Sequence, residues 1–217
     1  GRKKLKAQQV VQHLRDTFEG AATTQELQDV VRIAEEINRR KIESLRLYVP
    51  TSYQEEAHKC KSTNRIVSGG NQCGKSLWAA VEVARAALGR DPYGKYRKPE
   101  DESDFIIFVV GYDQKHVGRR LHRYLFRAGA FDIIRDPKTK EWRAFNPLED
   151  KKFAHLRKPA PPLIPPRMIK SISWVNKAAK VFDSVTLHNG TEIFAFPSKG
   201  EPPQGDQVDL YWIDEDI

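Results

Sequence analysis

The middle of the chain alternates between short apolar runs and stretches whose apolar residues recur at helical spacing. Residues 65–68 predict a strand, and residues 77–88 predict a helix that stops at Gly89. The continuous apolar run 105–110 predicts a strand buried on both faces. Strand, helix, buried strand and a further helix, in this order, predict an α/β fold with a mainly parallel central sheet flanked by helices.

Three more elements follow from the same pattern. Residues 114–131 predict a helix with an apolar side and a basic side; the basic side holds Arg119, Arg120, Arg123 and Arg127. Apolar runs on both sides of Asn189-Gly190 predict a hairpin over 181–196. Residues 208–213 predict a strand, and two acids follow it directly.

The ends of this core have a different pattern. Residues 1–47 show helical spacing and predict an N-terminal helical region, which leaves 48–217 as the core domain. Residues 135–170 lose all periodicity and hold ten Lys or Arg against four Asp or Glu, with seven prolines. A basic, irregular excursion of this length is typical of a nucleic-acid contact or of a plain surface loop, and both readings stay open.

Composition narrows the class of partner. The chain has 217 residues and a formal net charge of +8, which favours a polyanionic partner. Its two cysteines do not form a metal-binding or disulfide pattern. No apolar run approaches the ~20 residues of a membrane span, so no membrane partner is expected.

Residues 69–76 carry the clearest chemistry. They match the phosphate-binding pattern G-x-x-x-x-G-K-[ST] and lie between a predicted strand and a predicted helix. The backbone N–H groups of such a loop point at one phosphate, and the helix N-terminus adds its dipole. The expected nucleotide contacts come from Gly69, Gly70, Asn71, Gln72, Cys73, Gly74, Lys75 and Ser76. Lys75 is expected to reach the β- and γ-phosphates, and the Ser76 hydroxyl to join the Mg²⁺ shell.

The second half of the expected site is Asp214-Glu215, at the end of the last predicted strand. An acid at this place holds Mg²⁺, which we assign to Asp214. Hydrolysis also benefits from a carboxylate that polarises the attacking water, and Glu215 is placed for that catalytic role. About twenty residues before Lys75, Tyr53-Gln54 could bind adenine, since a ring stacks on the base and an amide reads its edge.

Taken in order, these motifs resemble the ATPase domain of the large subunit of tailed-bacteriophage terminases. The resemblance covers roughly residues 48–217 and rests on Tyr53-Gln54, the 65–76 segment, the 189–193 hairpin, Gly205 with Asp209, and Asp214-Glu215. It implies a P-loop NTPase fold of the ASCE type, with ATP and Mg²⁺ as cofactors. It further implies double-stranded DNA translocation by a homo-oligomeric ring, with portal protein and terminase small subunit as partners, in the host cytoplasm on the procapsid.

The chain departs from this family in three ways. Many terminases carry an arginine in the loop where Asn71 or Gln72 stands here. We therefore expect an arginine from elsewhere to act, and the candidates are Arg119, Arg120, Arg135, Arg143, Arg157 and Arg167. The sequence stops at Ile217, so we expect an incomplete sheet and weak or no ATPase activity by these residues alone. The family's C-terminal nuclease domain has no counterpart in these residues.

Two other functions remain open on the sequence. A helicase or repair translocase shares the loop and the paired acids, and further arginine-bearing motifs after those acids would identify it. A small-molecule kinase or nucleotide-binding regulator shares the loop, but it has less need of Glu215 beside Asp214 and normally adds a lid.

Overall fold

The computed structural model describes residues 24–70, 73–96, 105–199 and 207–214. Contacts group the chain into two units, Gly1–Ile42 and Glu43–Ile217. The described part of the first unit is helix α2 (Thr24–Lys41), on which Glu36 pairs with Arg39 and Arg40. Apolar side chains on this helix are solvent-accessible, since Val30 and Ile37 are each 51% exposed.

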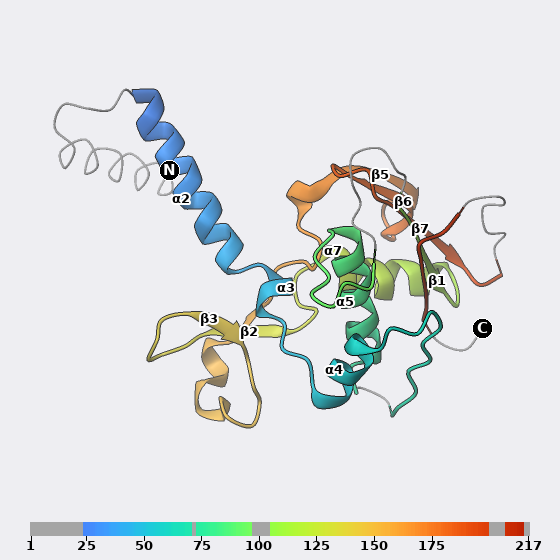
Figure 1. The fold of residues 1–217 in the computed structure, drawn as a ribbon, viewed down its shortest axis with the longest axis horizontal. Coiled ribbons are helices and arrows are strands. Elements are labelled where there is room, and N and C mark those ends of the chain that lie inside the picture. The colour runs from blue at the N-terminus through green and yellow to red at the C-terminus, as the bar shows by residue number, and fades with distance from the viewer. Residues whose placement is uncertain (1–23, 71–72, 97–104, 200–206, 215–217) are drawn as a thin grey trace. The chain divides into compact units, whose positions relative to one another are not determined.

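The second unit is built on a five-stranded sheet in the order β5-β6-β7-β1-β8 (Figure 1). Strand β1 (Ile106–Gly111) pairs in parallel with β7 (Glu192–Pro197) and with β8 (Leu210–Ile213). Strands β5 (Ile169–Asn176) and β6 (Val181–Leu187) add two antiparallel pairings. The α/β class is confirmed, but the sheet is mixed rather than mainly parallel because two consecutive hairpins extend it.

The hairpin predicted over 181–196 is confirmed as β6 and β7, with Gly190 at φ +85 in the turn. This turn also holds the end of helix α5 (Lys75–Ala87). Asn189 Nδ2 donates to the Ala87 carbonyl at 2.8 Å, and Thr191 Oγ1 donates to the same oxygen at 3.0 Å. The carbonyls of a last helical turn lack intrahelical partners, so these two bonds satisfy one of them.

Helices cover one face of the sheet. Helix α5 packs against β8 and against α7 (His122–Phe126). Helix α7 is preceded by α6 (Gln114–His116) and by the π-helical turn η1 (Val117–Leu121). The turn η1 contacts β1, β6 and β7. The core between these layers is mainly apolar, and the members of its apolar cluster include Ala80, Val81, Val109, Leu121, Val185 and Ile193.

The helix predicted over 114–131 is shorter than expected, but its two sides are confirmed. Val117, Leu121 and Leu125 are buried, whereas all four predicted arginines are exposed. The helix ends at Phe126 because Arg127 takes an extended conformation and Gly129 has φ +95.

The segment 135–170 is less irregular than predicted, because it contributes to a small sheet. Strands β2 (Asp132–Arg135), β3 (Trp142–Ala144) and β4 (Lys158–Pro159) form a small antiparallel sheet. Two 3₁₀ turns, η2 (Lys151–Leu156) and η3 (Pro166–Met168), complete the segment. Strands this short cannot display a period of two, so they leave no pattern in the sequence.

The strand predicted at 65–68, before the glycine-rich loop, does not form either. Its side chains still alternate, with Arg65 and Val67 partly buried and Ile66 98% exposed. The segment nevertheless has no ladder partner among the described residues, and β8 forms the edge of the sheet. Two short helices, α3 (Ser44–Leu47) and α4 (Ser52–Lys59), precede it.

Candidate functional site

The glycine-rich loop turns tightly into helix α5. Gly74 caps the helix with φ +88, a conformation that disfavours any residue with a side chain. A Cβ atom at Gly74 would lie 2.7 Å from Gln54 Nε2, and one at Gly69 would lie 2.9 Å from Cys73 Sγ. The loop therefore uses these two glycines to bring its backbone close to its neighbours. Asn71 and Gln72 lie outside the described residues.

Lys75 folds back over the start of the loop. Its Nζ donates to the carbonyl oxygens of Gly69 and Gly70, the latter at 3.0 Å, and lies 3.9 Å from Cys73 Sγ. The ammonium group thus sits on the same loop whose backbone N–H groups are expected to bind phosphate.

Helix α4 supports the loop from the side. Gln54 is 3% exposed, and its Nε2 donates to the Gly74 carbonyl at 3.0 Å while its Oε1 accepts from the Thr51 N–H at 2.9 Å. Tyr53 lies beside the same turn, with its hydroxyl 3.4 Å from the position of a Gly74 Cβ. Both ends of the Gln54 amide are thus engaged with the protein, and adenine recognition by Tyr53 and Gln54 stays a prediction.

Ser76 and Asp214 meet across 138 residues. Ser76 Oγ donates to Asp214 Oδ1 at 3.0 Å at the start of α5. Asp214 follows β8 directly, and its N–H donates to the Val110 carbonyl at 3.0 Å, which fixes it at the carboxyl end of β1. The two residues predicted to hold Mg²⁺ therefore lie in direct contact. Glu215 lies outside the described residues.

His116 joins this pair, although the sequence did not point to it. Its Nε2 lies 2.9 Å from Asp214 Oδ2, so the carboxylate is held by Ser76 on one oxygen and by His116 on the other. The position of His116 follows from local structure: Asp113 caps α6 by accepting the His116 N–H at 2.7 Å. A Cβ at Gly111 would lie 3.0 Å from His116 Cδ2, so the glycine leaves room for the ring.

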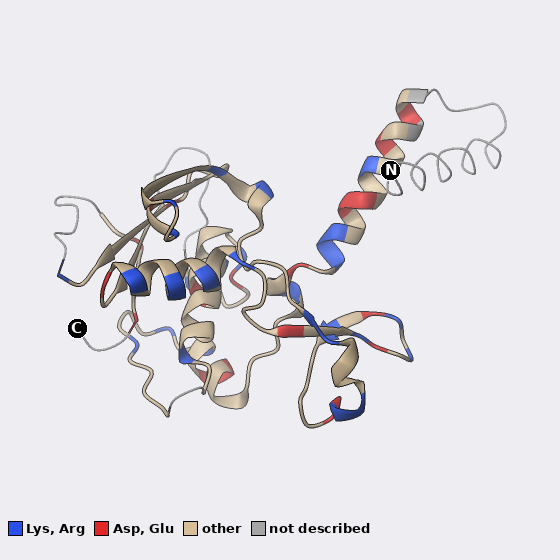
Figure 2. Cartoon of the chain, turned by 180° about the vertical axis from the view of Figure 1, so that it is seen from behind, with Lys and Arg blue, Asp and Glu red and all other residues tan. Residues whose placement is uncertain are grey.

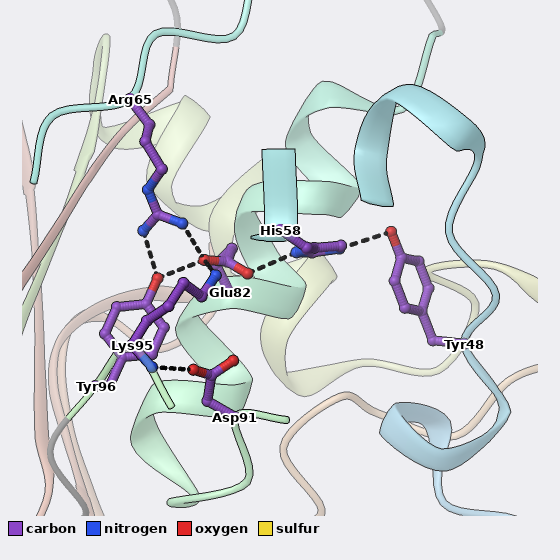
Figure 3. A network of polar contacts seen from close by, with 7 residues as sticks. All are labelled: Tyr48, His58, Arg65, Glu82, Asp91, Lys95 and Tyr96. Atoms are coloured by element: carbon purple, nitrogen blue, oxygen red, sulfur yellow. Dashed lines mark hydrogen bonds and ion pairs between the residues drawn. The ribbon is translucent and has the colours of Figure 1, made fainter. Parts of the chain in front are cut away.

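A buried polar cluster lies behind the loop, centred on the Glu82 carboxylate of α5 (Figure 3). Glu82 contacts His58 Nδ1, Arg65 Nη1 and Lys95 Nζ, each at 2.5 Å, and also accepts from the Tyr96 hydroxyl. Burial by itself raises the pKa of Glu82, but the hydrogen bonds from His58, Lys95 and Tyr96 outweigh it and lower the pKa to about 2. Glu82 is therefore ionised at neutral pH.

His58 connects the cluster to helix α4. Burial lowers its pKa against the opposing effect of Glu82, so the ring is neutral at pH 7. A neutral ring that donates from Nδ1 to Glu82 accepts at Nε2, where the Tyr48 hydroxyl lies 3.2 Å away. Arg65, which lies four residues before the loop, also donates to the Tyr96 hydroxyl at 2.5 Å. The cluster thus ties α4, the segment before the loop and α5 to one carboxylate.

Comparisons with protein-family models, curated proteins and solved structures found no match to this chain. Within the described residues, no three His, Cys, Asp or Glu side chains cluster as a metal site. Nor is any helix there both long and apolar enough to cross a membrane. The case for function therefore rests on the loop, the Ser76–Asp214–His116 contacts and the charges around them.

Proposed function

We propose that this chain is the ATPase part of a motor that moves double-stranded DNA, with a P-loop NTPase fold like that of terminase large subunits. The observation that carries the proposal is the contact between Ser76 and Asp214. A glycine-rich loop alone is a common pattern, whereas a loop hydroxyl 3.0 Å from an acid at the end of a parallel strand is the arrangement that Mg²⁺–nucleotide sites need.

The residues present fit Mg²⁺ and ATP. Gly69 and Gly74 allow a curled backbone that any Cβ would obstruct, and Lys75 lies on the same loop. Protein sites usually hold Mg²⁺ through one or two oxygens and leave the rest to phosphates and water, so Ser76 and Asp214 suffice as protein ligands. When bound, Mg²⁺ supplies neutralisation of the charge that develops on the phosphates during hydrolysis.

Each residue of the chain then has a stated task. The loop amides and Lys75 hold the phosphates, and His116 fixes the Asp214 carboxylate so that its other oxygen faces Ser76. Glu215 follows Asp214 directly and is assigned to activation of the attacking water. No arginine occurs within residues 69–76, so we assign charge neutralisation beyond Lys75 to an arginine of another segment or subunit.

The partners follow from the resemblance and from the charge. A net charge of +8 suits a nucleic-acid partner, and a terminase-like motor works as a homo-oligomeric ring with portal protein and a small subunit. Its place of action is then the host cytoplasm, on the procapsid.

Nucleotide binding tests the proposal first, because it does not depend on turnover. We expect a fluorescent ATP analogue to bind in the presence of Mg²⁺, Lys75→Ala to abolish binding or turnover, and Glu215→Gln to bind ATP without hydrolysing it. Failure of the unaltered chain to bind ATP would refute the proposal. Phosphorylation of a small metabolite without any response to duplex DNA would favour a kinase instead.

A further inference from the structure

The helical segment 114–126 presents a row of exposed cations along one side. Its basic residues, together with the residue that ends the helix, are all exposed; we call this set the basic stripe, and it consists of Lys115, Arg119, Arg120, Arg123 and Arg127. Four of the five are spaced four residues apart, so they lie on one side of the helix. At 1.5 Å per residue the stripe is about 18 Å long. Figure 2 shows these positions as blue bands along one helix.

The stripe carries its charge without local neutralisation. Within residues 24–70, 73–96, 105–199 and 207–214, no hydrogen bond or ion pair joins any of the five side chains to an acid. Other arginines of the chain are paired: Arg143 bonds both Asp136 and Asp150, and Arg90 bonds Glu43. The lack of bonded acids among the described residues is therefore a property of these five cations rather than of all arginines of the chain.

The opposite side of the helix is firmly anchored. Val117 is 1% exposed, and Leu121 and Leu125 are fully buried. A Cβ at Gly118 would lie 2.5 Å from the Ala179 carbonyl oxygen, so the helix lies directly against the turn between β5 and β6. The stripe is thus displayed on a fixed support.

That turn adds positive charge beside the stripe. Lys177 and Lys180 are both exposed there. On the buried side of the same helix, burial lowers the pKa of His122 to about 4, and the positive charges of Lys180 and Arg127 lower it further. The stripe and the turn therefore carry exposed positive charge on two neighbouring segments.

We propose that the basic stripe binds the phosphate backbone of duplex DNA, which names the contact surface for the partner in the proposed function and rests on that function. Duplex DNA carries one phosphate charge per about 1.7 Å of its axis, so a row of cations ~18 Å long faces a dense array of phosphates. Single-strand binders add aromatic side chains for stacking, and the stripe has none. A membrane-binding helix would expose its apolar side, whereas here that side is buried in the core.

The stripe is also connected to the loop. Helix α6, where the stripe begins, carries His116, whose Nε2 lies 2.9 Å from Asp214 Oδ2. Asp214 in turn accepts from Ser76 Oγ at 3.0 Å. A load on the stripe therefore acts on a helix that positions the carboxylate of the nucleotide site, which provides a route for DNA to alter ATP turnover.

The test compares two triple variants that remove the same charge. Lys115→Gln/Arg123→Gln/Arg127→Gln alters the stripe but keeps Arg119 and Arg120, which could serve as an arginine finger for a neighbour. The matched control, Lys138→Gln/Lys151→Gln/Lys152→Gln, removes three exposed cations of the small sheet and its 3₁₀ turn. Binding to a 30-base-pair duplex is measured by fluorescence anisotropy over a salt series, without nucleotide.

We expect the stripe variant to bind duplex DNA at least tenfold more weakly, with the slope of log K against log salt reduced by about 3. The control should stay within about twofold of the unaltered chain. Equal losses in both variants, or an unchanged salt slope in the stripe variant, would overturn the proposal. So would normal DNA binding combined with lost self-association or lost binding to anionic vesicles, because the stripe would then serve another partner.

The outcomes separate this inference from the proposed function. If the chain binds DNA through the stripe but binds no ATP, the ATPase proposal fails and the stripe assignment stands. If ATP binds normally and the stripe variant binds DNA like the unaltered chain, the stripe assignment fails alone.

Discussion

Replacement of Glu82 by Gln tests whether the buried cluster stabilises the segments on both sides of the loop. The substitution keeps the size of the side chain and removes its charge. Glu82 is 4% exposed, as is Lys95, and Arg65 is 13% exposed, so both cations would remain buried without their counter-charge. We expect the free energy of unfolding to fall by about 3–5 kcal/mol, the usual cost of removing one partner of a buried ion pair.

The same magnitude follows from the individual bonds. Hydrogen bonds to charged groups contribute about 1.5–3 kcal/mol each, and the substitution weakens those from Arg65 and Lys95. For a chain of this length, about 4 kcal/mol corresponds to a fall in Tm of about 8–16 °C. Urea unfolding followed by circular dichroism gives the free energy, and a thermal scan gives Tm.

The dependence on pH identifies the cause. The pKa of Glu82 is lowered to about 2 in the folded chain, so its stabilisation is present above the unfolded value near 4.5 and is lost as pH falls toward 2. The difference between the two proteins should therefore be constant from pH 5 to 8 and shrink below about 4.5. Glu55→Gln, which breaks an exposed pair with Lys59, is the control and should shift the unfolding midpoint little.

Two results would refute this reasoning. A loss below about 1 kcal/mol would mean that the charge of Glu82 is not needed. The double variant Glu82→Gln/Lys95→Met removes the stranded cation as well, and it should regain part of the stability. If its loss instead equals the sum of the two single losses, the two side chains are not coupled.

Three further predictions concern the loop, the buried histidines and His116. Gly74→Ala should lower the free energy of unfolding by at least about 1–3 kcal/mol and weaken ATP binding, because the backbone has φ +88 and the new Cβ would clash with Gln54. The control Gly94→Ala also has a positive φ, +62, but nothing lies within 4 Å of its Cβ, so ATP binding should be unchanged. Because burial lowers the pKa of His58 and His122, the free energy of unfolding measured in urea should fall as pH falls from 6.5 toward 4, and His122 should contribute up to about 3 kcal/mol of that fall. The variant His122→Phe should show a weaker dependence of the free energy of unfolding on pH. His116→Ala should raise the Mg²⁺ concentration needed for ATP binding by about tenfold, while the free energy of unfolding without Mg²⁺ changes little. An unchanged Mg²⁺ requirement would show that His116 does not position the Asp214 carboxylate.

Local patterns predicted the elements that have strong periodicity. The buried strand β1, the helix after the loop and the Asn189-Gly190 hairpin each depend on a run of residues long enough to show its period. The strands β2, β3 and β4 were missed because two to four residues cannot show one. Side-chain bonds hold β3 in place instead, because Arg143 bonds Asp150 and Asp136, each seven residues away along the chain.

The residues of the candidate site also differ in whether the sequence could predict them. The motifs at 69–76 and 214 could be recognised separately, and the packing of α5 against β8 brings Ser76 and Asp214 together. His116 lies 98 residues from Asp214, and a single histidine after a strand has no distinguishing pattern. Only the cap by Asp113 hints that a helix starts there and turns the ring back toward the strand ends.

Contacts with neighbouring helices hold the two ends of the loop in place without any bound phosphate. Helix α4 holds Gly74 through Gln54 at one end and reaches Glu82 through His58 at the other. Glu82 in turn fixes Arg65, so both sides of the loop are tied to the same helix pair. A loop whose two ends are already held in place loses less conformational entropy when a ligand binds. The Glu82 cluster should therefore contribute to nucleotide affinity as well as to stability, although none of its side chains belongs to the loop.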